Sequence, residues 1–236
     1  MILSKRLLTV KSLVPHGARL LDIGSDHALL PSSLFLDDTI RSAVVTDLKT
    51  GPLSRSRTQL EAACFGAPYS LLISDGFEAV DRDNYDFAAI CGMGGELIAR
   101  IINGGGDKAR IPMALQPMTA ADKLRAYLWD NGFSIEKEVF TTEDARVYVV
   151  MLVKPYPSGG NSRASERLSS CECSHSPYSY SDLYLGQCRP DTEEFALYAL
   201  KTARAAEKRL IGQRVRGEDT SKIEALIEEA LRFSVL

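Results

Sequence analysis

The sequence has no long hydrophobic run, few cysteines and no excess of either charge. No stretch approaches about 18 uncharged apolar residues, the length that a membrane-spanning helix needs, and Lys5, Arg6 and Lys11 interrupt the apolar N-terminus. We therefore expect no signal peptide and no membrane partner. The five cysteines are an odd number without the spacing of a disulfide framework, which is typical of proteins of the reducing cytoplasm.

The near-neutral charge balance excludes one class of nucleic-acid binder. With 28 Lys and Arg against 31 Asp and Glu, the formal net charge is −3, which argues against a protein that coats DNA as histones do. A local basic face that binds RNA stays compatible with this balance. Hydrophobic residues make up 45% of the 236 residues, so the chain has enough apolar mass for a folded core.

Composition divides the chain into three parts. Residues 1–156 alternate short apolar runs with helical patterns, which indicates an α/β domain with a mostly parallel sheet. Residues 157–181 are rich in serine, glycine and proline and are interpreted as a linker or loop. Residues 182–236 hold two amphipathic patterns, which predict an antiparallel, coiled-coil-like helical hairpin.

Five short apolar runs predict strands that are buried on both faces. They cover residues 19–23, 42–46, 69–73, 86–91 and 113–115, and helices are predicted over 4–14, 29–36, 52–64, 95–102 and 120–131. Residues 134–141 and 146–153 are predicted to form an antiparallel hairpin. Parallel strands finished by a hairpin are the layout of the class I methyltransferase sheet, which is Rossmann-like, although other doubly wound folds share part of it.

Acidic residues stand at the ends of three successive predicted strands. Asp22 ends the first strand, Asp47 closes the second, and Asp75 follows the third, in front of Gly76. Each has an ordinary alternative, such as a helix N-cap for Asp47 or a simple Asp-Gly turn for Asp75. Because all three would line the same carboxyl edge of a parallel sheet, we interpret them as one binding site.

The residues after the first strand indicate which cofactor fits this edge. Gly24 lets the backbone approach a ligand, but Ser25 and Asp26 follow it, so the G-x-G-x-x-G fingerprint of dinucleotide sites is missing. Acids here would repel a pyrophosphate and suit the sulfonium and ammonium groups of S-adenosylmethionine. In that interpretation Asp47 accepts the ribose hydroxyls and Asp75 accepts the adenine amino group.

Two more strand ends complete the predicted site. The run Gly92, Met93, Gly94 and Gly95 removes side-chain bulk where a flat base must meet the cofactor's methyl group, although a flexible turn would also explain these glycines. Gln116 ends the fifth strand and carries both a donor and an acceptor that suit the edge of a base.

These motifs together resemble a known family. The N-terminal S-K-R-L, then D-I-G-S-D-H-A, S-D-G, G-M-G-G and L-Q-P, in this order from Met1 to about Val153, are similar to the bacterial tRNA (adenine(22)-N1)-methyltransferases, often called TrmK. The resemblance implies S-adenosylmethionine as cofactor, tRNA as partner, and methyl transfer to N1 of an adenine at position 22 in the D-arm. Met118 and Leu29 depart from the family pattern, which often has Asn and an aromatic residue there.

The implied reaction needs alignment more than a strong base, because N1 of neutral adenine has an in-plane lone pair. On this hypothesis Asp26 accepts a hydrogen bond from the N6 amino group or stabilises the developing cationic ring. His27 orients Asp26 or packs beneath the cofactor, and a purely structural histidine is the alternative.

Basic residues concentrate in two stretches that could contact RNA phosphates, although a solvated helix face is the simpler interpretation. The candidates are Lys5, Arg6, Lys11, Arg204, Lys208, Arg209 and Arg214. We predict no metal site, because the spacing of the possible zinc ligands Cys171, Cys173, His175 and Cys188 is atypical. A methyltransferase for another nucleobase or a small molecule, or a non-catalytic RNA-binding protein, are the rival functions, and a monomer is favoured.

Overall fold

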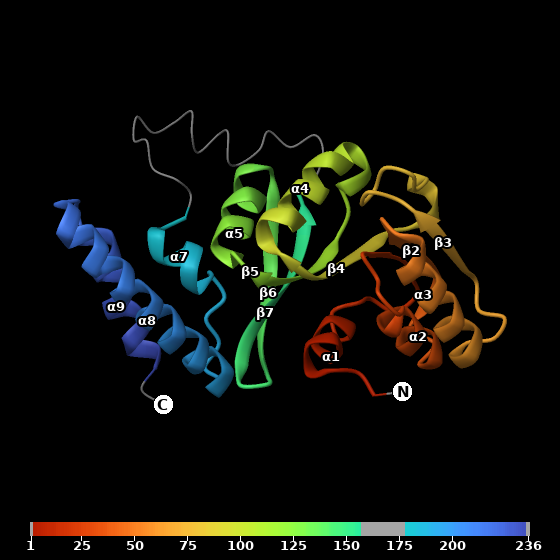
Figure 1. Ribbon diagram of the computed structural model, residues 1–236, viewed down its shortest axis with the longest axis horizontal. Helices are drawn as coiled ribbons and strands as arrows, with labels where there is room; N and C mark the ends of the chain where they lie inside the picture. The colour runs from red at the N-terminus through yellow and green to blue at the C-terminus, as the bar shows by residue number, and fades with distance from the viewer. Residues whose placement is uncertain (1, 157–177, 235–236) are drawn as a thin grey trace.

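The computed structural model describes residues 2–156 and 178–234, which form a seven-stranded mixed sheet between helices (Figure 1). The strand order is β3-β2-β1-β4-β5-β7-β6. The parallel strands are β1 (Ala18–Ile23), β2 (Ile40–Asp47), β3 (Tyr69–Ile73), β4 (Phe87–Gly94) and β5 (Met113–Thr119). Strands β6 (Phe133–Glu143) and β7 (Arg146–Pro155) form the antiparallel hairpin. The predicted class I methyltransferase layout is therefore confirmed.

Helices cover both faces of the sheet (Figure 1). The helices on one face are α1 (Lys5–Lys11), α2 (Leu29–Leu36) and α3 (Thr50–Ala63), and those on the other are α4 (Gly95–Gly105) and α5 (Ala121–Asp130). Two short 3-10 turns, Arg82–Asn84 and Gly106–Ala109, lie in the connections. The C-terminal part contains α7 (Tyr180–Leu185), α8 (Glu193–Arg216) and α9 (Ser221–Phe233). No helix in the described ranges is long and apolar enough to cross a membrane.

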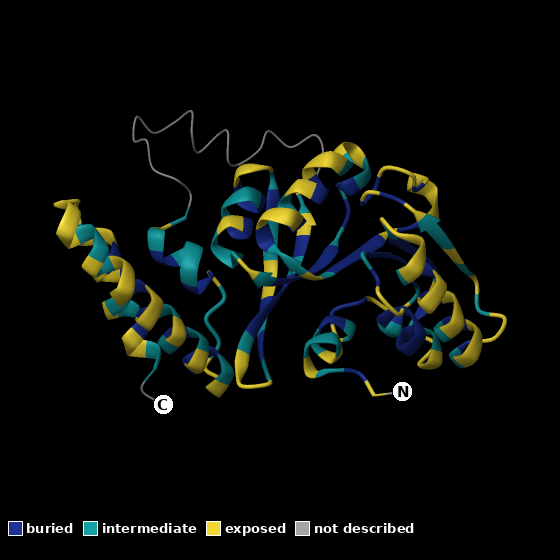
Figure 2. Cartoon of the chain, in the orientation of Figure 1, coloured by how far each residue is buried: buried dark blue, intermediate teal, exposed yellow. Residues whose placement is uncertain are grey.

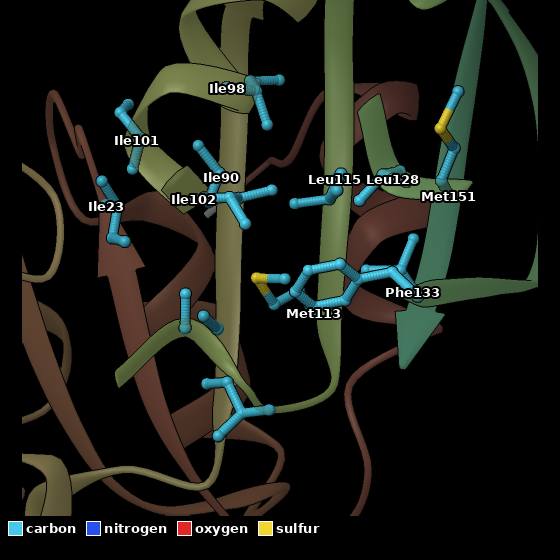
Figure 3. Packing of buried hydrophobic residues seen from close by; sticks show 14 of the residues in the cluster. Ile23, Ile90, Ile98, Ile101, Ile102, Met113, Leu115, Leu128, Phe133 and Met151 are labelled. Atoms are coloured by element: carbon cyan, nitrogen blue, oxygen red, sulfur yellow. The ribbon is translucent and has the colours of Figure 1, made fainter. Parts of the chain in front are cut away.

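The core explains why the central strands are continuously apolar. Strands β1 and β4 are buried on both faces, and apolar clusters fill the space above and below them (Figure 2). In Figure 3, Ile98 and Ile102 of α4 lie over Ile90 of β4 and Leu115 of β5. This packing fixes the strand ends, and with them the edge that carries the predicted site.

Strands β4 and β5 extend further than predicted. The predicted strands end at residues 91 and 115, but β4 runs to Gly94 and β5 to Thr119. The pairing of β4 with β5 is irregular on both sides of Met93, because a bulge accommodates the glycine-rich run. Gly92, with φ at +76°, takes a left-handed conformation that favours glycine.

The C-terminal helices are packed on the sheet domain. Helix α7 was not predicted, and it begins inside the range that was interpreted as a linker; residues 157–177 of that range lie outside the described residues. A capping box of Ser179 and Asp182 starts this one-and-a-half-turn helix. Phe195 of α8 packs against Phe140 of β6, with ring centroids 4.9 Å apart and the ring planes tilted by 56°.

Candidate active site at the carboxyl edge of the sheet

A cavity of about 290 Å³ opens between the loop after β1 and the end of β4. Its wall brings together five of the predicted cofactor-binding and catalytic residues, namely Asp22, Gly24, Asp26, His27 and Gly92. Arg6 and Leu7 of α1 close its other side. The juxtaposition follows from topology, because β1 and β4 are parallel neighbours in the middle of the sheet and both end here.

Asp22 is the buried acid of this cavity. The residue is only 5% exposed, and burial raises the pKa of its carboxyl to about 6, while a hydrogen bond with Ser25 lowers the pKa by less. A carboxylate with so little exposure to solvent favours a cationic partner. Cys91 lies beside it, and burial together with the charge of Asp22 raises the pKa of that thiol, so the thiol stays protonated.

Gly24 allows the loop to pass close to β4. Its φ is +73°, its N–H donates to the Thr46 carbonyl at 2.8 Å, and a Cβ here would lie 2.0 Å from Cε of Met93. The Met93 side chain therefore lies across the glycine and forms a wall between the β1 loop and β4. Any larger residue at position 24 would need a strained backbone and a displaced Met93.

Asp47 and Asp75 stand further along the same edge, at the ends of β2 and β3. Oδ1 of Asp47 accepts the backbone N–H of Lys49 at 2.9 Å, and Asp75 is exposed. At Gly76, with φ at +60°, a Cβ would lie 2.7 Å from Cγ2 of Ile101. Neither acid lines the cavity. The strand order β3-β2-β1 places both on the same edge of the sheet, and their contacts with a cofactor stay predictions.

Asp26 has a partner that the sequence did not reveal. Nε of Arg55, on α3, donates to Oδ1 of Asp26 at 2.9 Å, and Nε2 of His27 lies 3.8 Å from Oδ2. The hydrogen bond from Arg55 holds the pKa of the Asp26 carboxyl below its usual range. Both charged side chains are about half exposed, so the carboxylate stays open to a further donor. Position 55 follows an ordinary helical pattern, so nothing in the sequence singled it out.

Gln116 is fully buried and held by two donors. Its Oε1 accepts Nη1 of Arg6 at 2.8 Å and the backbone N–H of Gly92 at 3.1 Å, and its Nε2 donates to the Pro117 carbonyl at 3.0 Å. Sulfur of Met118 lies 3.7 Å from Nε2. The sequence predicted that Gln116 presents its amide to the edge of a base. In the structure the amide oxygen instead joins Arg6 of α1 to Gly92 of β4.

Gly94 and Gly95 make close packing possible where α4 begins. Gly94 is the N-cap residue of α4. A Cβ on Gly95 would lie 2.2 Å from the carbonyl oxygen of Ala120, so this glycine lets α4 approach the start of α5. Neither glycine lines the cavity, which Gly92 of the same run does.

A wide groove separates the β6–β7 hairpin from α8. Its two adjoining parts have volumes of about 980 and 570 Å³ and share Val147, Lys201, Ala205 and Lys208. Tyr148, Tyr184 and Tyr198 line the smaller part, next to the end of β5. The groove therefore combines cations with aromatic rings beside the cavity, a composition that suits nucleic acid.

The structure separates the predicted basic residues into two groups. Those that line the groove are Lys5, Arg204, Lys208 and Arg209, and Arg146 and Lys201 join them without having been predicted. The other three have acidic partners: Arg6 pairs with Glu143, Lys11 with Asp37 and Arg214 with Glu224. To predict that Lys201 lines the groove, one would need the helical periodicity of α8 and also the position of the β6–β7 hairpin.

The candidate zinc ligands fall partly within the described residues. Cys171, Cys173 and His175 lie outside them, and Cys188 is a free thiol. Among the residues that the structure describes, no group of three His, Cys, Asp or Glu side chains could hold a metal ion.

The residues at the carboxyl edge fit S-adenosylmethionine. Asp22 offers a buried carboxylate to a cationic group, while Gly24 and Gly76 keep side-chain bulk out of the two loops that would flank the ligand. Asp47 and Asp75 offer acceptors at the neighbouring strand ends. Acids at three strand ends match a cationic nucleoside better than a pyrophosphate.

Comparison with known proteins gives consistent similarities. A family profile described as a methyltransferase domain matches residues 3–151. The tRNA (adenine(22)-N(1))-methyltransferase of Bacillus subtilis is 35% identical over 154 residues, 64% of this chain and 65% of that protein, so the match spans just under two thirds of the relative's length.

Solved structures resemble the chain over nearly its whole length. A Streptococcus pneumoniae protein in complex with S-adenosyl-L-methionine superposes with a TM-score of 0.80 at 31% identity, covering 98% of this chain and all of the other. The crystal structure of the B. subtilis m1A22 tRNA methyltransferase TrmK has a TM-score of 0.75 at 27% identity, covering 99% of this chain and 97% of that one.

Proposed function

Because the chain belongs to the family of bacterial tRNA (adenine(22)-N1)-methyltransferases, we propose that it transfers a methyl group from S-adenosylmethionine to N1 of adenine 22 in tRNA. One observation of the structure carries the proposal best. An acid-lined cavity at the carboxyl edge adjoins a groove lined by cations and tyrosines, so a cationic cofactor and an RNA substrate would meet at the end of β4.

The cofactor, when bound, supplies a methyl group on a sulfonium sulfur. Asp22 holds the cationic end of the ligand, and Asp47 accepts from its ribose. Gly24, which has no side chain, would let the backbone of the β1 loop approach the ligand. Arg6 and Leu7 of α1 line the side of the cavity that faces the β1 loop.

The adenine is oriented by residues at the mouth of the cavity. Asp26 accepts from the N6 amino group, and Arg55 and His27 keep its carboxylate ionised and in place. N1 requires no base, so these side chains align the ring and move no proton from N1. The base must first leave its stack or pair, at a cost of a few kcal/mol that binding to the groove offsets.

The groove binds the tRNA backbone. Lys5, Lys201, Arg204 and Lys208 face the same hollow as the end of the β6–β7 hairpin. Phosphate contacts from such residues fix the position of the RNA without reading its sequence. Tyr184 and Tyr198 are partly exposed along the smaller part of the groove, where an unstacked base could contact them.

Mass spectrometry of nucleosides tests the proposal. Bulk tRNA is incubated with the protein and S-adenosylmethionine carrying a deuterated methyl group, then digested. We expect labelled 1-methyladenosine. Label in another nucleoside would favour a different base as substrate, and cofactor binding without any labelled nucleoside would favour a non-catalytic RNA-binding protein.

We also propose that the protein works in the cytoplasm as a monomer. Its described cysteines, Cys64, Cys91 and Cys188, are free thiols, as expected in a reducing compartment. The site and the groove are both built from a single chain, so one molecule carries all the parts that the proposal needs.

A further inference from the structure

The basic groove is also lined by three acids, Asp122, Glu143 and Asp144, and Glu143 is the one paired with a cation of the cofactor cavity. Glu143, at the end of β6, lines the groove beside Asp144, although a free carboxylate there would repel an RNA backbone. Glu143 is bound to Arg6 of α1. Its Oε2 accepts the backbone N–H of Arg6 at 3.0 Å and lies 3.3 Å from the guanidinium Nε.

Arg6 stands between the groove and the cofactor cavity. It lines the cavity, its Nη1 donates to Oε1 of Gln116 at 2.8 Å, and the same Oε1 accepts the N–H of Gly92 at the cavity rim. Its Cζ lies 5.2 Å from the ring centroid of Tyr148, which faces the groove. The guanidinium thus holds together the wall that a base entering from the groove would contact.

The proposed reaction creates a cation at this wall. The N1 lone pair forms the new N–C bond, the electrons of the C–S bond return to sulfur, and the positive charge passes from sulfur to the adenine ring. The side chains of Arg6 and Glu143 are only 21% and 20% exposed, so water screens their charges incompletely. An unbalanced guanidinium would therefore oppose the charge that appears on the ring.

We propose that Glu143 is the counter-ion that neutralises Arg6 toward the adenine ring. Arg6 can then position Gln116 and Gly92 without repelling the cationic product. The inference rests on the proposed function. It makes Glu143 a positioning residue that acts through Arg6.

Binding of substrate and product tRNA tests this inference. The affinity of each variant is measured for one tRNA carrying adenine and for the same tRNA carrying 1-methyladenosine at position 22. Glu143→Gln keeps the acceptor oxygen and removes the charge, so we expect the preference for methylated over unmethylated tRNA to fall roughly ten-fold. In Arg6→Met/Glu143→Gln the preference should return to within about two-fold of wild type.

Glu136→Gln is the matched control, because Glu136 lies on the same strand and is paired with Lys154. It should leave the ratio and the methylation rate unchanged. Calorimetry measures the affinity of each variant for S-adenosylmethionine, and thermal unfolding measures its stability. If both stay at the wild-type level, the variant has lost a charge without damage to the fold. The turnover of Glu143→Gln should also fall roughly ten-fold.

An unchanged ratio in a folded Glu143→Gln overturns the inference, as does a double variant no better than the single one. If Glu143→Gln does not fold, the same change in an Arg6→Met background decides: we expect a shift of less than about two-fold, and a roughly ten-fold loss would mean that Glu143 acts without Arg6. A wild-type protein that fails to methylate tRNA overturns the proposed function as well.

Discussion

At the scale of single residues, the burial of Asp22 links the cofactor site to stability. Its pKa of about 6 lies above the ordinary value of 3.8, so the folded state binds this proton more tightly than the unfolded chain does. The stabilising effect is complete below about pH 4 and is lost as pH rises through 6. Ionised Asp22 therefore destabilises the fold at neutral pH.

Asp22→Asn should make the protein more stable at pH 8 and weaken its binding of S-adenosylmethionine. Removing the buried charge should raise the free energy of unfolding by at most about 3 kcal/mol, and this gain should vanish near pH 4. Urea unfolding at the two pH values checks it. The affinity of the wild-type protein for the cofactor should also fall as the pH drops through 6, because Asp22 becomes protonated. If both proteins are equally stable at pH 8, Asp22 is not buried as a charged group.

Asp47→Ala should weaken cofactor binding without unfolding the protein. Loss of a charge-assisted hydrogen bond to the ribose should reduce affinity by about 1.5–3 kcal/mol. Asp37→Ala is a suitable control, since Asp37 ends α2 and pairs with Lys11. Calorimetry that finds wild-type affinity in folded Asp47→Ala would remove this residue from the site.

At the scale of elements, one buried ion pair joins the C-terminal helices to the sheet. Nε of Arg125, on α5, donates to Oε1 of Glu138, on β6, at 2.8 Å, and both side chains are fully buried. Nη1 of Arg125 also donates to the Leu183 carbonyl of α7 at 2.8 Å. Loss of this guanidinium would leave a buried carboxylate and a buried carbonyl without their donor.

Arg125→Ala should therefore lower the free energy of unfolding by about 3–5 kcal/mol, because Glu138 would keep an uncompensated charge. Arg125→Met/Glu138→Leu should restore much of that stability, since apolar side chains of similar volume avoid the cost of burying charge. Arg232→Ala, which breaks an exposed pair with Glu228, should cost less than about 1 kcal/mol. A double variant as unstable as Arg125→Ala would contradict this explanation.

The elements also show where the sequence sufficed. Residues 29–36 and 69–73 were predicted with their observed bounds, because short apolar runs between turn residues determine such elements locally. Helix α7 was missed because its position depends on Arg125, which is 55 residues earlier than Tyr180. The strand ends beyond residues 91 and 115 were missed because glycine and proline there indicate turns, whereas pairing with a neighbour keeps them extended.

The same limit applied to the site. Acids at strand ends were predicted correctly in position because strand order alone brings parallel ends to one edge. Arg55 and Glu143 were missed because their partners, Asp26 and Arg6, lie 29 and 137 residues away along the chain. Such pairings are set by packing, and a sequence pattern of short range does not contain them.

At the scale of the whole molecule, positive charge is gathered in the groove although the net charge is −3. Changing Lys201, Arg204 and Lys208 together to Gln should weaken tRNA binding and leave cofactor affinity unchanged. The slope of log affinity against log salt concentration should flatten by about 0.7–0.9 for each phosphate that the protein no longer neutralises. The measurement is tRNA binding at several salt concentrations.

The matched control for that experiment changes Lys154, Lys222 and Arg232 to Gln, which removes the same charge from exposed positions away from the groove. We expect it to affect tRNA binding far less. An equally large fall in affinity for both triple variants would mean that the overall charge, and not the groove, attracts the RNA.

Methyl transfer to a pair of tRNA transcripts that differ at one nucleotide tests the central proposal most directly. One transcript has adenine at position 22 and the other has guanine there, with compensating changes that keep the D-arm paired. We predict one methyl group per molecule on the first transcript, located at N1 of adenine 22, and none on the second. Equal methylation of both transcripts, or of neither, would contradict the proposed function.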